Sequence, residues 1–70
     1  LKLLTLTAAS PFVGRTVIEC RSREDYHCLI VGVEREGEEL HAPSPTETFA
    51  EGDTLWLVGE PQDIYRLAEV

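Results

Sequence analysis

Positive charge and methionine are both scarce in this sequence of 70 residues. Six lysines and arginines face thirteen aspartates and glutamates, which leaves a formal net charge of −7. A protein that binds nucleic acid needs a basic surface to neutralise phosphates, and an anionic membrane surface makes a similar demand. We therefore expect neither nucleic acid nor direct membrane insertion among its interactions. Methionine is absent altogether, so we expect the chain to be a piece of a longer protein.

Cysteines and long apolar runs are also in short supply. The two cysteines, Cys20 and Cys28, do not form a CxxC pair, and a disulfide scaffold of this size would contain more of them. We interpret them as buried thiols in a reducing compartment. No apolar run approaches the ~20 residues that a membrane-spanning helix requires.

The apolar residues that are present suffice for one small domain. The apolar fraction is 43% and the charged fraction is 27%, which is typical of a globular protein. A domain of about 60 residues buries only roughly 60% of the surface of its unfolded chain, so its stability alone is marginal. Dimerisation is one common remedy. We predict a single domain over residues 1–70 that forms a homodimer.

The predicted centre of this domain is the segment Thr54-Leu55-Trp56-Leu57-Val58. It follows a predicted turn at Glu51-Gly52-Asp53, where glycine supplies the positive φ and aspartate can bond its own backbone. A short apolar run bounded by glycines predicts a strand buried on both faces, and five residues are too few for a helix. The only tryptophan lies in this run, which favours the central position in the sheet.

Three further strands are predicted around this centre. Residues 1–7 are rich in leucine and threonine, and residues 28–35 are mostly β-branched or apolar. After a turn around Gly37, residues 39–42 return as a shorter strand, so residues 28–42 are predicted to form a hairpin. Prolines 43 and 45 end this strand, because proline cannot donate to a ladder of hydrogen bonds.

Two helices complete the predicted fold. Residues 15–26 carry a short apolar stripe. Arg21 and Asp25 on the polar face have the i, i+4 spacing of a pair, but a solvated charged face is the interpretation we prefer. Residues 60–68 have Pro61 at the first helical position, where its missing N–H costs nothing, and an apolar face of i, i+3, i+4 spacing.

The predicted fold class is α+β, a small mixed or antiparallel sheet with two helices in the order β-α-β-β-β-α. Between the first strand and the first helix, Phe12 and Val13 precede Gly14. We expect these two apolar side chains to fill the core where the chain turns.

The sequence shows no catalytic constellation. His27 and His41 are the only histidines, and neither has a partner at metal-ligand spacing. His27 and Cys28 are neighbours in an extended segment, so their side chains point to opposite faces and cannot act as base and nucleophile. A zinc site of Cys20, His27 and Cys28 would offer three ligands, whereas structural zinc takes four. We expect no enzyme activity, no metal and no cofactor; a small enzyme or metal carrier built on these residues, His41 and nearby acids is the alternative.

The acidic residues between positions 34 and 39 form the densest run of charge in the chain. Their simplest interpretation is a solvated hairpin end. A divalent-cation site is the alternative, because carboxylate oxygens suit hard cations.

Four motifs, in this order, resemble the TrkA-C family, which is also called RCK_C. The family pattern opens with P-L-x-G-K-T, continues with a hairpin xxAIxRxG and a P-x-P crossing, and finishes with L-x-x-G-D-x-L-x-V-x-G. The matching segments span nearly the whole chain and are residues 10–16, 28–37, 42–45 and 51–59. Departures are mild: Phe12 replaces the usual leucine and Arg15 the usual lysine.

The resemblance implies a domain that is often dimeric and that serves as the cytosolic regulatory part of a transporter or channel for monovalent cations or small anions. The chain is most similar to domains at the C-terminal tail of Kef-type cation/proton antiporters. The resemblance therefore implies a transmembrane transporter as part of the same chain and a position at the cytoplasmic face of the cell membrane. Trk-type potassium uptake regulators and dicarboxylate or sulfate permeases carry such domains too, and a purely structural dimerisation module is a further alternative.

Some members of the family bind cyclic di-AMP at the dimer interface, and a His-Asn-Pro-like crossing with a nearby arginine typifies them. In this chain the crossing lacks the asparagine, and Glu36 and Glu38 stand where positive charge would help an anionic nucleotide. Both differences disfavour a cyclic dinucleotide. A small-molecule ligand, by this resemblance, would contact a set of five residues: Ile30, Val31, His41, Ala42 and Pro43. The alternative is that His41 is simply a strand residue at the edge of the sheet.

Overall fold

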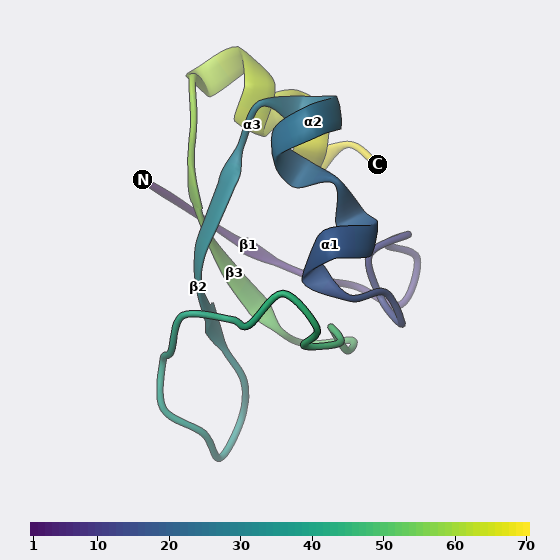
Figure 1. Ribbon diagram of the computed structural model, residues 1–70, viewed down its shortest axis with the longest axis vertical. Coiled ribbons are helices and arrows are strands. Elements are labelled where there is room, and N and C mark those ends of the chain that lie inside the picture. Colours follow the sequence, from purple (N-terminus) through teal and green to yellow (C-terminus); the bar gives the residue numbers. More distant parts are fainter.

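The computed structural model describes residues 1–70 and contains three strands and three helices (Figure 1). In chain order these are β1 (Lys2–Thr5), α1 (Val17–Cys20), α2 (Ser22–Tyr26), β2 (Leu29–Glu34), β3 (Thr54–Val58) and α3 (Pro61–Ala68). The strands form one antiparallel sheet in the order β1-β3-β2. The predicted α+β class is confirmed, and the strand with the only tryptophan lies at the centre of the sheet.

The register of the sheet assigns each residue to one of its two faces. Leu55 of β3 lies opposite Leu4 and Val33, whereas its neighbour Trp56 lies opposite Leu3 and Gly32. The register shifts between Ile30 and Gly32. Val31 is therefore an extra residue in β2, which is the arrangement of a β-bulge.

All three helices lie on the same side of the sheet (Figure 1). As a result β3 alternates: Leu55 and Leu57 are buried, whereas Trp56 is half-buried and Val58 is exposed. The prediction of a central strand buried on both faces is wrong for the single chain, because no helix covers the second face.

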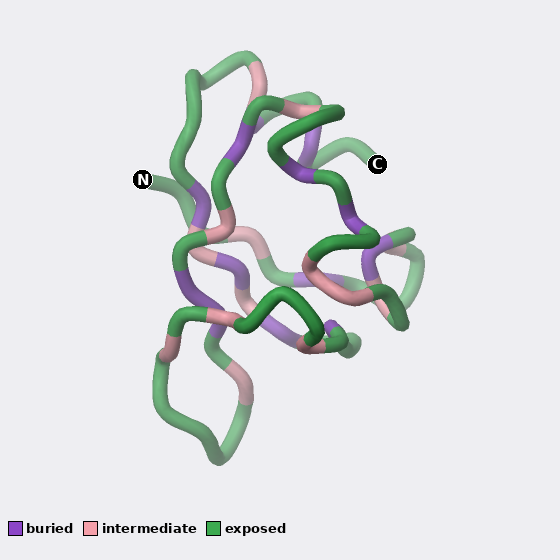
Figure 2. The backbone as a smooth tube through the Cα atoms, in the orientation of Figure 1, coloured by how far each residue is buried: buried purple, intermediate pink, exposed green.

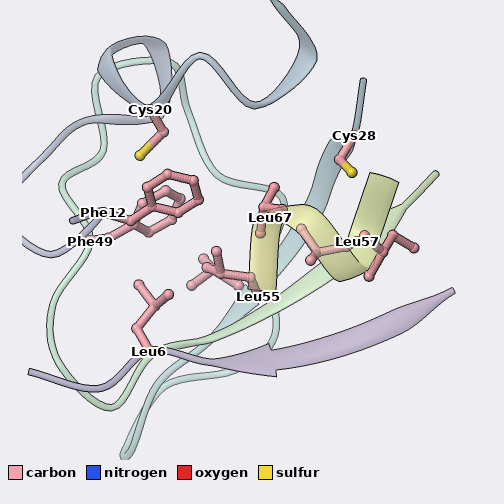
Figure 3. Close-up of a cluster of buried hydrophobic side chains, with 10 residues drawn as sticks. Leu6, Phe12, Cys20, Cys28, Phe49, Leu55, Leu57 and Leu67 are labelled. Carbon is pink, nitrogen blue, oxygen red and sulfur yellow. The ribbon is translucent and has the colours of Figure 1, made fainter. Parts of the chain in front are cut away.

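The buried residues lie on segments of the sheet, the helices and the loops between them (Figure 2), and the apolar ones form one core cluster. Figure 3 shows Phe12 and Phe49 beneath the sulfur of Cys20 at one end, with Leu55 and Leu67 between them and Leu57. Phe12 is 2% exposed, and Val13 is partly buried against the core, so both side chains fill the core as predicted. The buried apolar residues are Leu6, Phe12, Cys20, Cys28, Val33, Phe49, Leu55, Leu57, Ile64 and Leu67.

The first predicted helix is divided in two, so the prediction of one continuous helix over residues 15–26 is wrong. Arg21 stands between α1 and α2 with φ 52° and ψ 42°, in the left-handed region. Cys20 and Ser22 are both buried, and residues two apart lie on different sides of a continuous helix. The turn at Arg21 lets both side chains face the core. Arg21 and Asp25 do pair, with Arg21 Nε 3.3 Å from Asp25 Oδ1, on a face where both side chains remain exposed to solvent.

The prediction of a strand over residues 39–42 is also wrong, because this segment pairs with the sheet only through one isolated bridge, between His41 and Val33. The amide of Val33 donates to the carbonyl of His41 at 2.8 Å, and the amide of His41 donates back at 3.2 Å. Two residues later Pro43 has no N–H to continue the ladder. The loop after β2 projects from the molecule and is exposed along most of its length (Figures 1 and 2). In contrast, α3 begins with Pro61 as predicted.

Candidate functional site

The sheet face opposite the helices carries a patch that we call the outer apolar face. Trp56 lies at its centre, next to Leu3 across the β1 pairing, and Val58 lies opposite Leu29. Each of its four aliphatic residues keeps between 42% and 56% of its surface exposed. The outer apolar face consists of Leu3, Leu29, Leu40, Trp56 and Val58. It holds most of the large apolar surface that the chain leaves exposed on the sheet.

Gly32 allows this face to assemble. A Cβ at Gly32 would lie 3.0 Å from Leu40 Cδ1 and 3.4 Å from Trp56 Cβ. The absence of a side chain therefore lets Leu40 lie across β2 beside the indole. The indole N–H donates to Glu34 Oε1 at 2.8 Å, which fixes the ring. The face is thus ordered within the single chain.

A cluster of charged side chains lies where β2 ends and β3 begins; we call it the Arg35 cluster, formed by Arg35, His41, Glu47 and Asp53. Asp53 is only 2% exposed. Arg35 binds it with two parallel bonds, Nε to Oδ1 at 3.0 Å and Nη2 to Oδ2 at 2.7 Å, and the amide of Ala50 adds a third at 2.9 Å. Burial alone would raise the pKa of Asp53, but these donors outweigh it and hold the pKa below its ordinary value.

Glu47 joins two members of this cluster. One of its oxygens, Oε2, lies 3.1 Å from Arg35 Nη1 and 2.9 Å from His41 Nε2. Burial opposes the charge on Glu47, yet the bond from His41 and the charges of His41 and Arg35 lower its pKa. Glu38 Oε1 lies 3.9 Å from the same arginine nitrogen. The guanidinium is therefore surrounded by carboxylates of its own chain.

The five residues predicted to contact a ligand lie in three different settings. Ile30 packs against the core opposite Leu57, whereas its neighbour Val31 is exposed at the bulge. His41 belongs to the Arg35 cluster. Ala42 is exposed and Pro43 half-buried, where the chain leaves the sheet. Whether the five contact a ligand stays a prediction.

Sequence reasoning missed the outer apolar face and the partners of Arg35. Arg35 and Asp53 both lie within the motifs that resemble the family, but their spacing of 18 residues gives no sign of a pair. A hollow of about 470 Å³ between β1 and α3 was not predicted either, and it shares no residue with the predicted ligand set.

The remaining residues that were considered for catalysis or metal binding do not gather at one site. Cys20 and Cys28 are free and buried; burial raises the pKa of the Cys20 thiol to about 11 and raises that of Cys28 as well. No three histidine, cysteine or acidic side chains converge on a position where a metal ion could be held. None of the helices has the length and hydrophobicity that crossing a bilayer demands.

The comparisons with known proteins agree on the fold. The sequence model of the TrkA-C domain family matches residues 1–70. The RCK_C domain dimer of S. agalactiae BusR in complex with c-di-AMP is similar with a TM-score of 0.81 at 23% identity, over 97% of this chain and 88% of that one. The RCK C domain of the potassium transport protein KtrA in complex with c-di-AMP is similar with a TM-score of 0.80 at 26% identity, over 97% and 80%.

A third similar structure is a much larger protein. The GsuK channel bound to NAD matches with a TM-score of 0.79 at 27% identity, over 97% of this chain but only 12% of its own. No curated protein sequence matches this chain. Because the family pattern extends over every residue and the RCK_C fold is reproduced over nearly the whole chain, the chain belongs to the TrkA-C (RCK_C) domain family.

Proposed function

We propose that this chain is a non-catalytic regulatory and dimerisation domain of a monovalent-cation transport protein. Among hosts, the domain at the C-terminal tail of a Kef-type cation/proton antiporter is the one its sequence most resembles, so it would act at the cytoplasmic face of the cell membrane. Its membership of the TrkA-C family supports this function. Structural neighbours include a potassium transport protein and a channel. A Trk-type potassium uptake regulator and a dicarboxylate or sulfate permease are the alternative hosts.

The outer apolar face is the observation that carries the proposal. Soluble monomers seldom expose a contiguous apolar patch without a partner for it. A second copy of the chain is the partner we propose, because the BusR neighbour is described as an RCK_C domain dimer. In a two-fold interface the same patch meets itself, so the two outer apolar faces would cover each other and bury both copies of Trp56.

Charge also favours this face for self-association. Each copy carries a net charge of −7, so most approaches of two copies are repulsive. Glu34 is the only acidic residue in the three strands, whereas the loop after β2 carries Glu36, Glu38 and Glu39. Two copies can therefore meet there with less like-charge contact than over the acidic loop after β2.

Ligand sensing is the second half of the proposal. A ligand shifts a transporter between states only if it binds those states with different affinities. The BusR and KtrA neighbours hold c-di-AMP, which carries two phosphates. In this chain Asp53 and Glu47 already neutralise Arg35. We therefore propose a neutral or cationic ligand here.

The dimer is tested by one substitution in the outer apolar face and one outside it. Leu3→Glu adds a charge within the face, next to Trp56, and Ile18→Glu adds the same charge at a similarly exposed apolar position on α1. Both side chains are more than half exposed, so neither substitution removes core packing. Sedimentation equilibrium should show a dimer for the parent chain and Ile18→Glu, and mainly a monomer for Leu3→Glu. A parent chain that stays monomeric at millimolar concentration contradicts the proposal.

The ligand is tested by thermal unfolding with c-di-AMP, adenosine, K⁺ and Na⁺. A ligand at a hundredfold its Kd should stabilise the domain by about 2.7 kcal/mol. Stabilisation by a cation or by the neutral nucleoside, without an effect of c-di-AMP, supports the proposed ligand class. Stabilisation by c-di-AMP alone contradicts that class, and no response to any probe favours a purely structural dimerisation module.

A further inference from the structure

The segment over residues 38–48, which we call the crossing segment, contains three of the predicted ligand residues. Its main-chain link to the sheet is the bridge between His41 and Val33. Its far end is bonded to the start of α1, where the amides of Val17 and Ile18 donate to the carbonyls of Glu47 and Pro45 at 3.1 and 3.2 Å. Between these main-chain links, side chains add one further connection: Glu47 binds both His41 and, at the end of β2, Arg35.

Both ring nitrogens of His41 face oxygen atoms that accept hydrogen bonds. Nδ1 lies 3.1 Å from the backbone carbonyl oxygen of Glu39, and Nε2 lies 2.9 Å from Oε2 and 3.1 Å from Oε1 of Glu47. A carbonyl oxygen cannot donate, and neither can an ionised carboxylate. Both nitrogens must then carry a proton. The geometry is that of an imidazolium cation, because neutral histidine has only one N–H to donate.

The charges around His41 favour that cation. Glu47 and Glu38 approach it from the crossing segment, and Asp53 adds a negative charge from the turn before β3. Arg35 opposes them from the end of β2, but it is itself paired with these same carboxylates. The bonds to the Glu39 carbonyl and to Glu47 raise the pKa of His41 above its ordinary value of 6.5, against a smaller opposing effect of burial.

We propose that the proton on His41 is a pH-dependent lock, which fixes the crossing segment while it is bound and loosens that segment when it is lost. Neutral His41 can keep its bond to Glu39 or its bond to Glu47, but not both. Loss of either bond frees one part of the turn that positions Ala42 and Pro43. Arg35 still binds Glu47, so the segment loosens without detaching. The regulatory meaning of the lock rests on the proposed function, whereas the lock itself does not.

The lock is tested by following the His41 ring by NMR as the pH is raised, in the free chain without ligand or transporter. His41→Gln identifies the signal. We expect the ring to titrate above its ordinary pKa in the parent chain. Glu47→Gln should move the titration to lower pH, because the amide can still accept a bond but carries no charge. Glu38→Gln is the matched control: it removes a carboxylate that does not bond to His41, so its effect should be smaller.

The second readout is amide hydrogen exchange, corrected for its intrinsic pH dependence. The amide of Glu47, which donates to the carbonyl of Ser44 at 3.1 Å, reports on the crossing segment. Its protection should fall several-fold between about pH 5.5 and about pH 8.5 in the parent chain, relative to the amides of β3, and should stay level in His41→Gln. A ring that titrates at or below its ordinary pKa overturns the proposal. Protection of the Glu47 amide that stays constant while the His41 ring titrates overturns it as well.

These outcomes are independent of the proposed function. If both measurements give the expected result but the chain neither dimerises nor binds a ligand, the lock is supported and the proposed regulatory function is contradicted. If the chain dimerises but both measurements fail, the proposed function is supported and the lock is contradicted.

Discussion

Asp53 shows at the scale of a single residue how this small domain tolerates a buried charge. It is 2% exposed, and three donors take the place of water: two from Arg35 and the amide of Ala50. Breaking such a pair from one side leaves a charge without its partner, which costs more than the intact pair contributes. Arg35 keeps 23% of its side chain exposed, so water can partly compensate the loss.

Asp53→Ala should therefore lower the free energy of unfolding by roughly 2–3 kcal/mol, below the about 3–5 kcal/mol of a fully buried pair. Asp53→Asn should cost less, because its amide oxygen can still accept from Ala50. Urea unfolding at neutral pH measures both. Asp25→Ala is the control, because it removes the exposed pair with Arg21, which contributes only about 0.2–0.5 kcal/mol to stability. Equal costs for Asp53→Ala and Asp25→Ala would show that the buried pair is unimportant.

At the scale of elements, α1 and α2 are too short to be stable by themselves. Their stability comes from what holds their ends. Thr16 and Glu19 form a capping box at the start of α1, with the Thr16 amide 2.9 Å from Glu19 Oε1 and the Glu19 amide 3.2 Å from Thr16 Oγ1. The next free amides, on Val17 and Ile18, donate to carbonyls of the crossing segment. The start of α1 is thus bonded both to itself and to that segment.

Thr16→Ala removes the side-chain half of this capping box and should cost about 1 kcal/mol of stability. Thr16→Ser keeps the hydroxyl and should stay close to the parent. Chemical denaturation of the three proteins side by side measures the difference. If serine costs as much as alanine, the hydroxyl is not what stabilises the start of α1.

The same elements show what the sequence can and cannot predict. Residues 54–58 and 61–68 were predicted well because their signals are local: glycines bracket the strand, and Pro61 marks the first helical position. The break at Arg21 depends on burying Cys20 and Ser22 against distant parts of the chain, which no local pattern encodes. The Arg35 cluster likewise joins residues far apart in sequence. The unbroken apolar run of β3 predicted two buried faces, and the proposed dimer would bury the second.

At the scale of the whole molecule, stability should depend on pH in both directions. The folded chain lowers the pKa of Glu19, Glu47 and Asp53 from ordinary values of 4.5, 4.5 and 3.8. Their contribution is present above those values and is lost as the pH falls through the lowered ones. His41 is the opposite case: its contribution is present below 6.5 and is lost as the pH rises through its raised pKa.

We therefore expect the free energy of unfolding to be greatest between about pH 4.5 and about pH 6.5 and to fall on either side. Urea midpoints across a series of buffers at constant ionic strength measure it. His41→Gln should flatten the alkaline side while leaving the acid side in place. Stability that keeps rising beyond the titration of His41 would contradict this account.

The two buried cysteines can report whether parts of the domain open to solvent separately or together. Cys20 is 3% and Cys28 0% exposed, and only a thiolate that reaches solvent reacts with an alkylating reagent. Cys20 ends the short α1, whereas Cys28 lies beneath Gly59, whose added Cβ would come within 3.1 Å of its sulfur. Mass spectrometry of chains pulsed with N-ethylmaleimide should find Cys20 modified first if α1 opens alone, and both at one rate if the molecule opens as a unit.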